Sequence, residues 1–351
     1  MRCFQLVGFG EPLQEKQSPC PAPAGSEVVL RILASGVCHS DLHICEGHHD
    51  LGGGKRISLE GRIPMPLTPG HEITGEIVEM GPDAIGLQLG DRVLACSWIG
   101  CSACKACLAG EEHLCRAPRF LGANRDGGYA NLVTIPHPRY LIPLNGLDPL
   151  RAASLVCSGL TTYSALKKID ANASLKQQAI VIIGAGGLGL MSLQILKMLD
   201  GAGAVVVEID AKKREAALDG GAIAAIDPNQ AGASKSIRTA AGGEVGAVID
   251  FVGSGDTAKL GFDLLAPGGK LVIVGLFGGA VTLSVPLIPM KSAKIEGSYI
   301  GSPAELRELI ALVQEKGMPQ IPIDVRPLGD VNAALSDLQH GRVVGRVVLV
   351  P

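Results

Sequence analysis

The strongest fold signal in the chain is the stretch Ala179-Ile180-Val181-Ile182-Ile183-Gly184-Ala185-Gly186-Gly187-Leu188-Gly189. Its first half is a short apolar run rich in β-branched residues, which predicts a buried strand. Its second half has the G-x-G-x-x-G spacing, and residues 190–199 after it are apolar enough for a buried helix. Glycines at such points let the backbone approach a pyrophosphate, whose charge then faces the N-terminus of the helix. The stretch therefore predicts a dinucleotide-binding turn formed by Gly184, Gly186, Gly187, Leu188 and Gly189.

A carboxylate follows at the spacing that such a turn requires. Glu208 ends the next apolar run, nineteen residues beyond Gly189. An acid at this place accepts hydrogen bonds from the adenosine ribose and repels a 2′-phosphate. It favours NAD over NADP, although Lys212, Lys213 and Arg214 follow closely. The alternative is a tight turn between a strand and a helix, with an incidental acid nearby.

The pattern around this stretch defines the fold class. Apolar, β-rich runs recur at residues 179–183, 204–208, 245–250 and 270–274. Helical or loop segments separate them, which is typical of an α/β fold with a doubly wound parallel sheet. Residues 1–156 instead alternate short strand-like segments with Gly/Pro turns and are expected to be mainly β. A helix is predicted at 303–316 and a strand at 343–351. The expected divisions are 1–156, 157–298 and a segment 299–351 that returns to the first domain.

The composition excludes several classes of protein. The chain has 351 residues, of which 47% are hydrophobic and 19% charged, and its formal net charge is -3. This length suggests two domains, and this charge gives no reason to expect nucleic acid or an anionic membrane as a partner. The N-terminus lacks a signal-peptide pattern, and no run of about 18 apolar residues is present to span a bilayer. We therefore expect a cytoplasmic protein whose ten cysteines bind metal or stay reduced.

Four of these cysteines form a compact motif. They have the spacing C-x2-C-x2-C-x7-C and are Cys101, Cys104, Cys107 and Cys115. Four thiolates at such spacing suit a closed, tetrahedral zinc site that has no open position for chemistry. Disulfides, which the cytosol disfavours, and an iron–sulfur cluster are the alternatives. The motif predicts structural zinc.

A second group of polar residues follows a strand-like run at 28–33. It reads Gly36-Val37-Cys38-His39-Ser40-Asp41-Leu42-His43. A thiolate is a strong zinc ligand, a hydroxyl beside a metal can pass a proton, and a carboxylate can orient another ligand's imidazole. A catalytic zinc set of two thiolates and one imidazole needs two more ligands, and His71 and Cys157 supply candidates. The alternative is a polar turn with one buried cysteine, since spacing alone cannot bring such distant residues together.

Together these motifs make the chain resemble the zinc-dependent alcohol dehydrogenases of the medium-chain dehydrogenase/reductase superfamily, especially the prokaryotic NAD-dependent tetrameric enzymes. The resemblance covers essentially the whole chain. The resemblance rests on the motifs GVCHSDLH (36–43), PGHE (69–72), the four-cysteine motif, CSGLTTY (157–163), GAGGLG (184–189) and VGLFG (274–278). It implies a Rossmann domain beside a mainly β, GroES-like catalytic domain, two zinc ions per chain and a homo-oligomer, either a dimer or a tetramer. The implied activity is reversible oxidation of an alcohol to an aldehyde or ketone by hydride transfer to NAD.

The resemblance also implies roles for single residues near the metal. Cys38, His71 and Cys157 would hold the catalytic zinc, with Glu72 as an occasional further ligand. Asp41 would bond the far nitrogen of His71. Ser40 and His43 would relay the proton, through the nicotinamide ribose, to water.

For the cofactor, the resemblance places His39 and Arg346 near the pyrophosphate. Thr161 would contact the nicotinamide, and the backbone at Leu276 and Phe277 would meet its carboxamide. Trp98 would line the substrate pocket, although a pure packing role is an equal alternative.

Several features stay open. Residues 46–65 are expected to form a longer loop than in many relatives, either a solvated surface loop or a lid over the pocket. Cys3, Cys20, Cys45 and Cys96 are interpreted as packed thiols. The apolar alternation at 281–285 predicts an edge strand that pairs across a two-fold axis.

Two other functions are alternatives. A polyol, threonine or aldehyde-specific dehydrogenase of the same superfamily is the first, and Cys157 weighs against it because polyol and threonine enzymes commonly carry an acid there. A zinc-bearing nucleic-acid or redox-sensing module is the second, and the absence of a basic stripe argues against nucleic acid.

Overall fold

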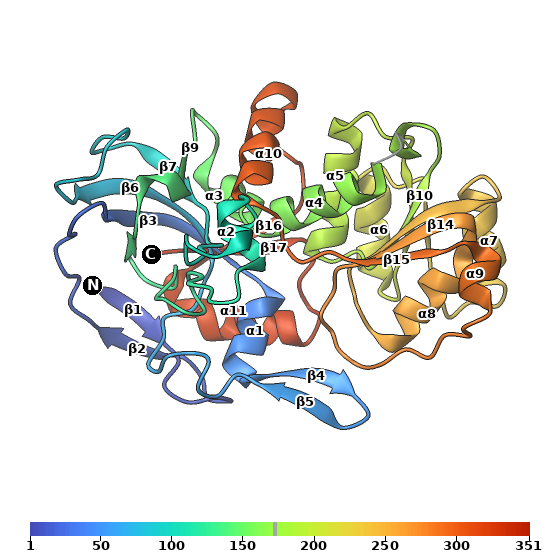
Figure 1. Ribbon diagram of the computed structural model, residues 1–351, viewed down its shortest axis with the longest axis horizontal. Coiled ribbons are helices and arrows are strands. Elements are labelled where there is room, and N and C mark those ends of the chain that lie inside the picture. Colours follow the sequence, from blue (N-terminus) through green and yellow to red (C-terminus); the bar gives the residue numbers. More distant parts are fainter. Residues whose placement is uncertain (171–173) are drawn as a thin grey trace.

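The computed structural model describes residues 1–170 and 174–351, which form two main sheets with helices packed between and around them (Figure 1). One sheet is parallel and lies at the right of Figure 1, and the other is mostly antiparallel and lies at the left. Among the described residues, no helix has both the length and the apolar character needed to cross a membrane.

The parallel sheet has six strands in the order β12-β11-β10-β13-β14-β15. This is the doubly wound order of dinucleotide-binding folds, in which the first strand of the unit lies at the centre. The strands are β10 (Ile180–Ile183), β11 (Ala204–Val207), β12 (Ala224–Ile226), β13 (Val245–Asp250), β14 (Leu265–Ile273) and β15 (Lys294–Gly297). All side chains of β10 and β11 are buried, as expected for strands covered on both faces. The predicted runs at 179–183, 204–208, 245–250 and 270–274 are confirmed as strands.

The other main sheet has seven strands, and its members come from both ends of the chain. Its order is β16 (Ile323–Pro327), β17 (Arg346–Val350), β3 (Val28–Val37), β6 (Glu72–Met80), β7 (Arg92–Ala95) and β9 (Leu141–Pro143), with β8 (Leu132–Ile135) paired to β3. β17 pairs antiparallel with β3, with Val348 opposite Gly36. The C-terminal strand therefore completes the sheet that the N-terminal part begins. Two hairpins stand apart: β1 (Arg2–Gln5) with β2 (Gln14–Gln17), and β4 (His48–Gly52) with β5 (Lys55–Ser58).

The helices are α1 (His39–Glu46), α2 (Lys105–Leu108), α3 (Pro149–Ala152), α4 (Ser158–Asp170), α5 (Gly187–Met198), α6 (Ala211–Asp219), α7 (Ala233–Ala240), α8 (Gly255–Leu264), α9 (Leu287–Lys291), α10 (Pro303–Lys316) and α11 (Val331–Gln339). The prediction of a helix at 303–316 is confirmed at both ends. Ser302 caps this helix by accepting the amide of Glu305, whose side chain caps in return, and Pro303 occupies the first turn. Short 3₁₀ turns lie at Glu112–Leu114, Pro138–Tyr140, Ala153–Leu155, Ser174–Lys176 and Leu328–Asp330.

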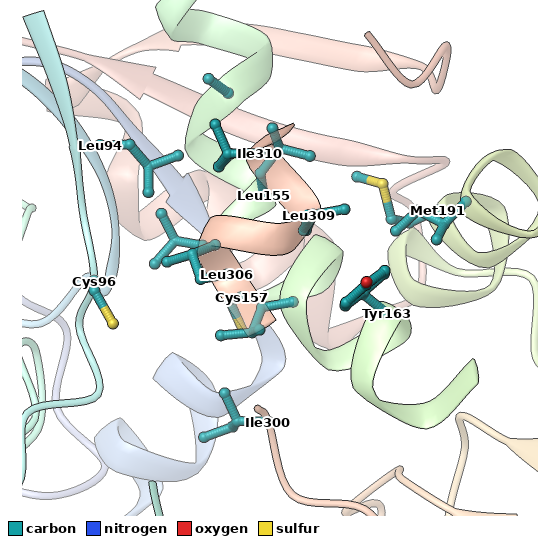
Figure 2. Close-up of a cluster of buried hydrophobic side chains, with 14 of the residues drawn as sticks. Leu94, Cys96, Leu155, Cys157, Tyr163, Met191, Ile300, Leu306, Leu309 and Ile310 are labelled. Atoms are coloured by element: carbon teal, nitrogen blue, oxygen red, sulfur yellow. The ribbon is translucent and has the colours of Figure 1, made fainter. Parts of the chain in front are cut away.

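One apolar cluster runs through both sheets and fixes how they sit together. Figure 2 shows its centre, where Leu306, Leu309 and Ile310 of α10 lie between Leu94 of β7 and Met191 of α5. Buried leucines of this kind each stabilise a fold by about 2–5 kcal/mol relative to alanine. Cys157 belongs to the same cluster (Figure 2), so a candidate metal ligand is held by well-packed core.

Two sequence predictions need correction. Residues 281–285 form no strand, because the edge of the parallel sheet is occupied by β15, which pairs with β14. Residues 46–65 are not a plain loop, because they contain the β4–β5 hairpin. This hairpin extends below both domains in Figure 1, and its tip touches the parallel-sheet domain: a Cβ added at Gly52 would lie 2.6 Å from the amide nitrogen of Ala280.

Candidate active site and metal centres

Three potential ligands from distant parts of the sequence meet at one point. Cys38 follows β3 and precedes α1, His71 directly precedes β6, and Cys157 directly precedes α4. β3 and β6 are antiparallel neighbours with Gly36 opposite Glu72, and this register brings Cys38 beside His71. The ligand atoms of Cys38, His71, Glu72 and Cys157 all lie within 4.8 Å of one another. The fold thus assembles the set that spacing alone could not establish.

The thiols and the imidazole fit a zinc ion. The Sγ atoms of Cys38 and Cys157 are 3.9 Å apart, close to the edge of about 3.8 Å expected for a tetrahedron with Zn–S bonds of about 2.3 Å. Nδ1 of His71 lies 3.0 Å from Oδ1 of Asp41, which directs Nε2 toward the thiols as a ligand. Among the described residues, the buried Nε2 has no hydrogen-bond partner. A buried polar atom without a partner costs free energy, and a bound cation would remove that cost.

The local electrostatics favour the ligating forms of these groups. The contact with Cys157 lowers the pKa of the Cys38 thiol well below its usual value, and the same contact raises the pKa of the Cys157 thiol. One thiolate therefore forms readily, and a cation would displace the proton from the second thiol. Burial alone would lower the pKa of His71, but Asp41 outweighs burial and raises it. The Asp41 carboxylate thus makes the imidazole a stronger base.

Glu72 and Arg346 form a buried ion pair beside the ligands. Burial raises the pKa of Glu72 to about 7 against the attraction of Arg346. Oε2 of Glu72 has no partner in the described chain. The side chain of Arg346 also lies directly against the start of α5, since a Cβ added at Gly187 would lie 2.4 Å from Cδ of Arg346. A fixed positive charge therefore stands between the metal ligands and the glycine-rich turn.

The four-cysteine motif is gathered around α2. Sγ of Cys104 lies 3.5 Å from Cys107 and 3.8 Å from Cys115, and Cys101 lies 4.0 Å from Cys107. These separations match a zinc tetrahedron and exceed a disulfide bond of about 2.05 Å. A backbone hydrogen bond from Ala103 lowers the pKa of Cys101 to about 6, which favours the thiolate. None of the ten cysteines, all of which lie in the described residues, forms a disulfide. The four cysteines of the motif therefore fit a closed zinc site.

Glu112 joins this cysteine lobe to the rest of the domain. Its Oε2 accepts the amide of Gly100 over 3.2 Å and the hydroxyl of Tyr140 over 2.9 Å. Arg139 lies 3.3 Å from Oε1. Sequence reasoning assigned no role to Glu112, because a single acid among polar lobe residues gives no signal before its partners are known.

The glycine-rich turn lies at the carboxyl end of β10, as its sequence predicts. α5 begins at Gly187, three residues before the predicted start at 190, so the turn and the helix N-terminus are one unit. A Cβ added at Gly189 would lie 1.9 Å from the carbonyl oxygen of Gly184. Only glycine permits this approach between helix and strand. The first amides of a helix have no partner within the helix, so the N-terminus of α5 suits an anion.

Glu208 lies against the same turn. It directly follows β11, and its Oε2 accepts the amide of Ala185 over 2.8 Å while Oε1 accepts the amide of Asp210 over 3.0 Å. The carboxylate is therefore held at the edge of the sheet beside the glycine-rich turn. Leu276 and Phe277 follow β14 at the same carboxyl edge and are largely exposed, and Thr161 is buried in the first turn of α4.

The polar residues of α1 are spread along the helix. Oγ of Ser40 lies 3.9 Å from Sγ of Cys38. His43 lies one turn further and is partly exposed, and its ring centroid is 5.1 Å from that of His49 in β4. In the described part of the chain, no hydrogen bond joins Ser40 to His43. His39 is exposed at the start of the helix.

Trp98 packs beside the metal ligands. Its ring centroid is 5.4 Å from that of His71 and 5.1 Å from that of Phe120, and its Nε1 donates to the carbonyl of Val156 over 3.3 Å. With 5% of its surface exposed, Trp98 has a packing role, and its position next to His71 is compatible with lining a pocket. Ser97 beside it donates to the carbonyl of His71, a support that the sequence did not reveal.

The parallel sheet, the glycine-rich turn and the two ligand sets define a metal-binding dehydrogenase with a nucleotide cofactor. Residues 24–146 match the alcohol dehydrogenase GroES-like domain and residues 187–315 match the zinc-binding dehydrogenase domain. The chain is 38% identical to an NAD-dependent alcohol dehydrogenase of Sulfurisphaera tokodaii and 36% identical to one of Saccharolobus solfataricus, in both cases over 100% of both chains. The crystal structure of an alcohol dehydrogenase from Aeropyrum pernix, 30% identical, superposes with a TM-score of 0.89 over 100% of both chains. The chain belongs to the zinc-dependent alcohol dehydrogenase family of the medium-chain dehydrogenase/reductase superfamily.

Proposed function

We propose that this member of the family oxidises primary and secondary alcohols reversibly to aldehydes and ketones at a zinc site formed by Cys38, His71 and Cys157. The observation that supports this proposal is the buried cluster of two thiols and an imidazole whose Nε2 has no partner among the described residues. When bound, zinc supplies a Lewis acid that lowers the pKa of an oxygen ligand, and NAD accepts the hydride. Glu72 is an occasional further ligand in this proposal.

The chain's own residues move the proton and orient the reactants. In this proposal Ser40, whose Oγ lies 3.9 Å from Sγ of Cys38 on the first turn of α1, receives the alcohol proton. The nicotinamide ribose would connect Ser40 to His43, and His43, which is partly exposed, would pass the proton to water. Proton transfer by such a pair contributes about 10²–10⁴-fold. Asp41 holds His71 in the tautomer that leaves Nε2 for the metal. Trp98 packs against His71 and helps to exclude water from the pocket.

The cofactor site lies across the carboxyl edge of the parallel sheet. The pyrophosphate would bind the N-terminus of α5, with His39 and Arg346 as nearby positive or polar groups. Thr161 would contact the nicotinamide, and the backbone at Leu276 and Phe277 would meet its carboxamide. Glu208 would bind the adenosine ribose.

The variant Glu208→Gln tests the cofactor assignment. The amide keeps a hydrogen-bond acceptor for Ala185 but removes the negative charge that repels a 2′-phosphate. We expect the kcat/KM ratio of NAD to NADP to fall by about tenfold or more, which corresponds to about 1.4 kcal/mol. Steady-state rates with both cofactors measure this ratio. The exposed Glu215→Gln on α6 is the matched control and should leave the ratio unchanged, and an unchanged ratio in Glu208→Gln would contradict the ribose contact.

A panel of alcohols tests the substrate class. Aliphatic, aromatic and cyclic alcohols should reduce NAD, with NADH formation followed by absorbance. Polyols or threonine are the alternative substrates, and Cys157 at the third ligand position supports simple alcohols instead. Turnover restricted to a polyol or to threonine would overturn this assignment.

Further parts of the proposal concern the whole chain. We propose a second, structural zinc in the lobe of Cys101, Cys104, Cys107 and Cys115. We propose three divisions of the chain: a catalytic domain at 1–156, a cofactor domain at 157–298 and a segment at 299–351 that returns to the catalytic domain. The seven-stranded sheet supports this return, because β17 pairs with β3 of the N-terminal part and β16 pairs with β17. The proposed location is the cytoplasm, with neither nucleic acid nor membrane as a partner.

We also propose a homo-oligomer, a dimer or a tetramer. Val285 and Met290, which shortly precede β15 in the sequence, are 73% and 76% exposed, and β15 is the edge strand of the parallel sheet in the described part of the chain. Such an exposed patch beside a free sheet edge favours contact with a second copy. Light scattering should report a mass of at least two chains, and a stable monomer would contradict this.

We also propose that the β4–β5 hairpin acts as a lid over the pocket. Its tip touches the loop after Phe277, which supports this role. Replacing residues 48–58 with a short linker should change the relative rates of large and small alcohols. Unchanged selectivity would favour a surface element without influence on the pocket.

A further inference from the structure

Tyr129 lies behind the metal ligands and has no part in the roles described above. Its side chain is fully buried in the apolar cluster that includes residues of β1, α1 and α11. The backbone of Tyr129 is fixed on two sides, since its amide donates to the carbonyl of Pro69 over 3.0 Å and its carbonyl accepts the amide of Phe4 over 2.8 Å. The main chain and the core therefore hold the ring in one place.

The hydroxyl of Tyr129 contacts the carboxylate of Asp41, the residue that supports His71. It donates to Oδ2 of Asp41 over 2.7 Å, and the same oxygen accepts the amide of Cys38 over 3.0 Å. The other oxygen, Oδ1, lies 3.0 Å from Nδ1 of His71. Asp41 is fully buried, and in the described chain no lysine or arginine lies within ion-pair distance of it. A buried carboxylate without such a cation depends on its hydrogen bonds, so each of the three donors matters.

The ring of Tyr129 also supports the backbone next to the ligand. Gly70 precedes His71 and has φ of 91°. A Cβ added at Gly70 would lie 2.6 Å from Cδ1 of Tyr129, so the aromatic ring lies directly against this turn. Tyr129 therefore contacts the support of His71 twice, through the Asp41 side chain and through the Gly70 backbone.

We propose that Tyr129 is a positioning residue for the catalytic zinc site, which fixes the Asp41 carboxylate and through it the orientation of His71. This inference rests on the proposed function, because it requires zinc at Cys38, His71 and Cys157. Without the hydroxyl, the carboxylate loses one of its three donors and gains freedom to rotate, and His71 loses part of its orientation. Removing outer partners of metal ligands typically costs about 10–100-fold in metal affinity or activity, and the lower end of this range is expected here.

The variant Tyr129→Phe removes only the hydroxyl and keeps the ring in the core. The zinc-loaded protein is mixed with a chelating indicator, and the release of zinc is followed over time. Release from the catalytic site should become about tenfold faster, while release from the four-cysteine lobe should stay unchanged. Replacing the catalytic zinc with Co²⁺ gives a second readout, in which the visible absorption bands of the metal should shift.

Tyr163→Phe is the matched control. Tyr163 donates to Oε2 of Glu308 over 3.1 Å, so this variant removes a tyrosine–carboxylate bond of the same kind outside both ligand sets. Both release rates should equal those of the unmodified protein. If both variants lower the melting temperature but leave the zinc release rate and the Co²⁺ spectrum unchanged, the hydroxyl of Tyr129 contributes only to packing, and the positioning role is overturned.

The possible outcomes distinguish a failure of the positioning role of Tyr129 from a failure of the proposed function. Wild-type release rates and an unchanged Co²⁺ spectrum in folded Tyr129→Phe would overturn the positioning role. Should that variant not fold, Tyr129→Met also removes the hydroxyl while keeping a long, adaptable apolar side chain in the core; faster release from the catalytic site supports the role, and an unchanged rate overturns it. An unmodified protein that carries zinc only in the lobe would instead overturn the proposed function itself.

Discussion

Replacing Cys38 with serine is expected to abolish alcohol oxidation and to leave NAD binding largely intact. Cys38 contributes one of the two thiols that lie 3.9 Å apart beside His71, and a hydroxyl is a far weaker zinc ligand than a thiolate. A Lewis acid supplies several kcal/mol of transition-state stabilisation. Loss of about 4 kcal/mol corresponds to roughly a 10³-fold fall in kcat. Cofactor binding should persist because the glycine-rich turn and Glu208 belong to the other sheet.

The measurements are steady-state turnover and NADH binding by fluorescence titration. Cys45→Ser is the matched control, since Cys45 lies on the same helix, α1, and belongs to neither ligand set. Its burial raises its pKa to about 12, so it is a packed thiol and its variant should retain turnover. Equal loss of turnover and NADH binding in Cys38→Ser would show that this cysteine is structural.

Replacing Cys107 with serine is expected to release the lobe zinc and to lower stability strongly. Residues 101–115 contain only short helical segments, and their four sulfurs lie within 4.8 Å of one another. Zinc in a closed site contributes directly to folding free energy. A loss of about 3 kcal/mol would lower the melting temperature by roughly 5–10 °C. Zinc content and thermal unfolding check both parts of this expectation.

Cys96→Ala is the control for this second prediction. Cys96 is buried at the end of β7, near the lobe but outside its ligand set. Its truncation should cost about 1 kcal/mol and leave the zinc content unchanged. A Cys107→Ser protein with full zinc and an unchanged melting temperature would remove the structural role of the lobe.

The parts of the fold that were predictable are those with local signals. β10 and β11 are buried on both faces, so their sequences are continuous apolar runs that need no partner to be recognised. The helix at 303–316 carries its own boundary in the capping residues Ser302 and Glu305. Residues 281–285 show the limit of such patterns, because apolar alternation does not reveal which segment occupies the sheet edge.

The candidate site was predictable only in part. The four-cysteine lobe and the glycine-rich turn are contiguous, so their spacing predicts their chemistry. Cys38, His71 and Cys157 are brought together by the pairing of β3 with β6 and by the core around α4. Ligand chemistry made them candidates, but their spacing in the sequence could not show that they meet, and the resemblance to a family supplied that expectation. Tyr129 gave no signal at all, because its role depends on the distance between its hydroxyl and Asp41.

Metal analysis of the purified protein shows whether Cys38, His71 and Cys157 hold a zinc ion on which turnover depends. We expect about two zinc ions per chain, one for each ligand set. Brief treatment with a chelator should remove one of them with loss of turnover, and added zinc should restore activity. A protein that holds zinc only in its four-cysteine lobe and still oxidises alcohols at full rate would contradict a catalytic zinc site at Cys38, His71 and Cys157.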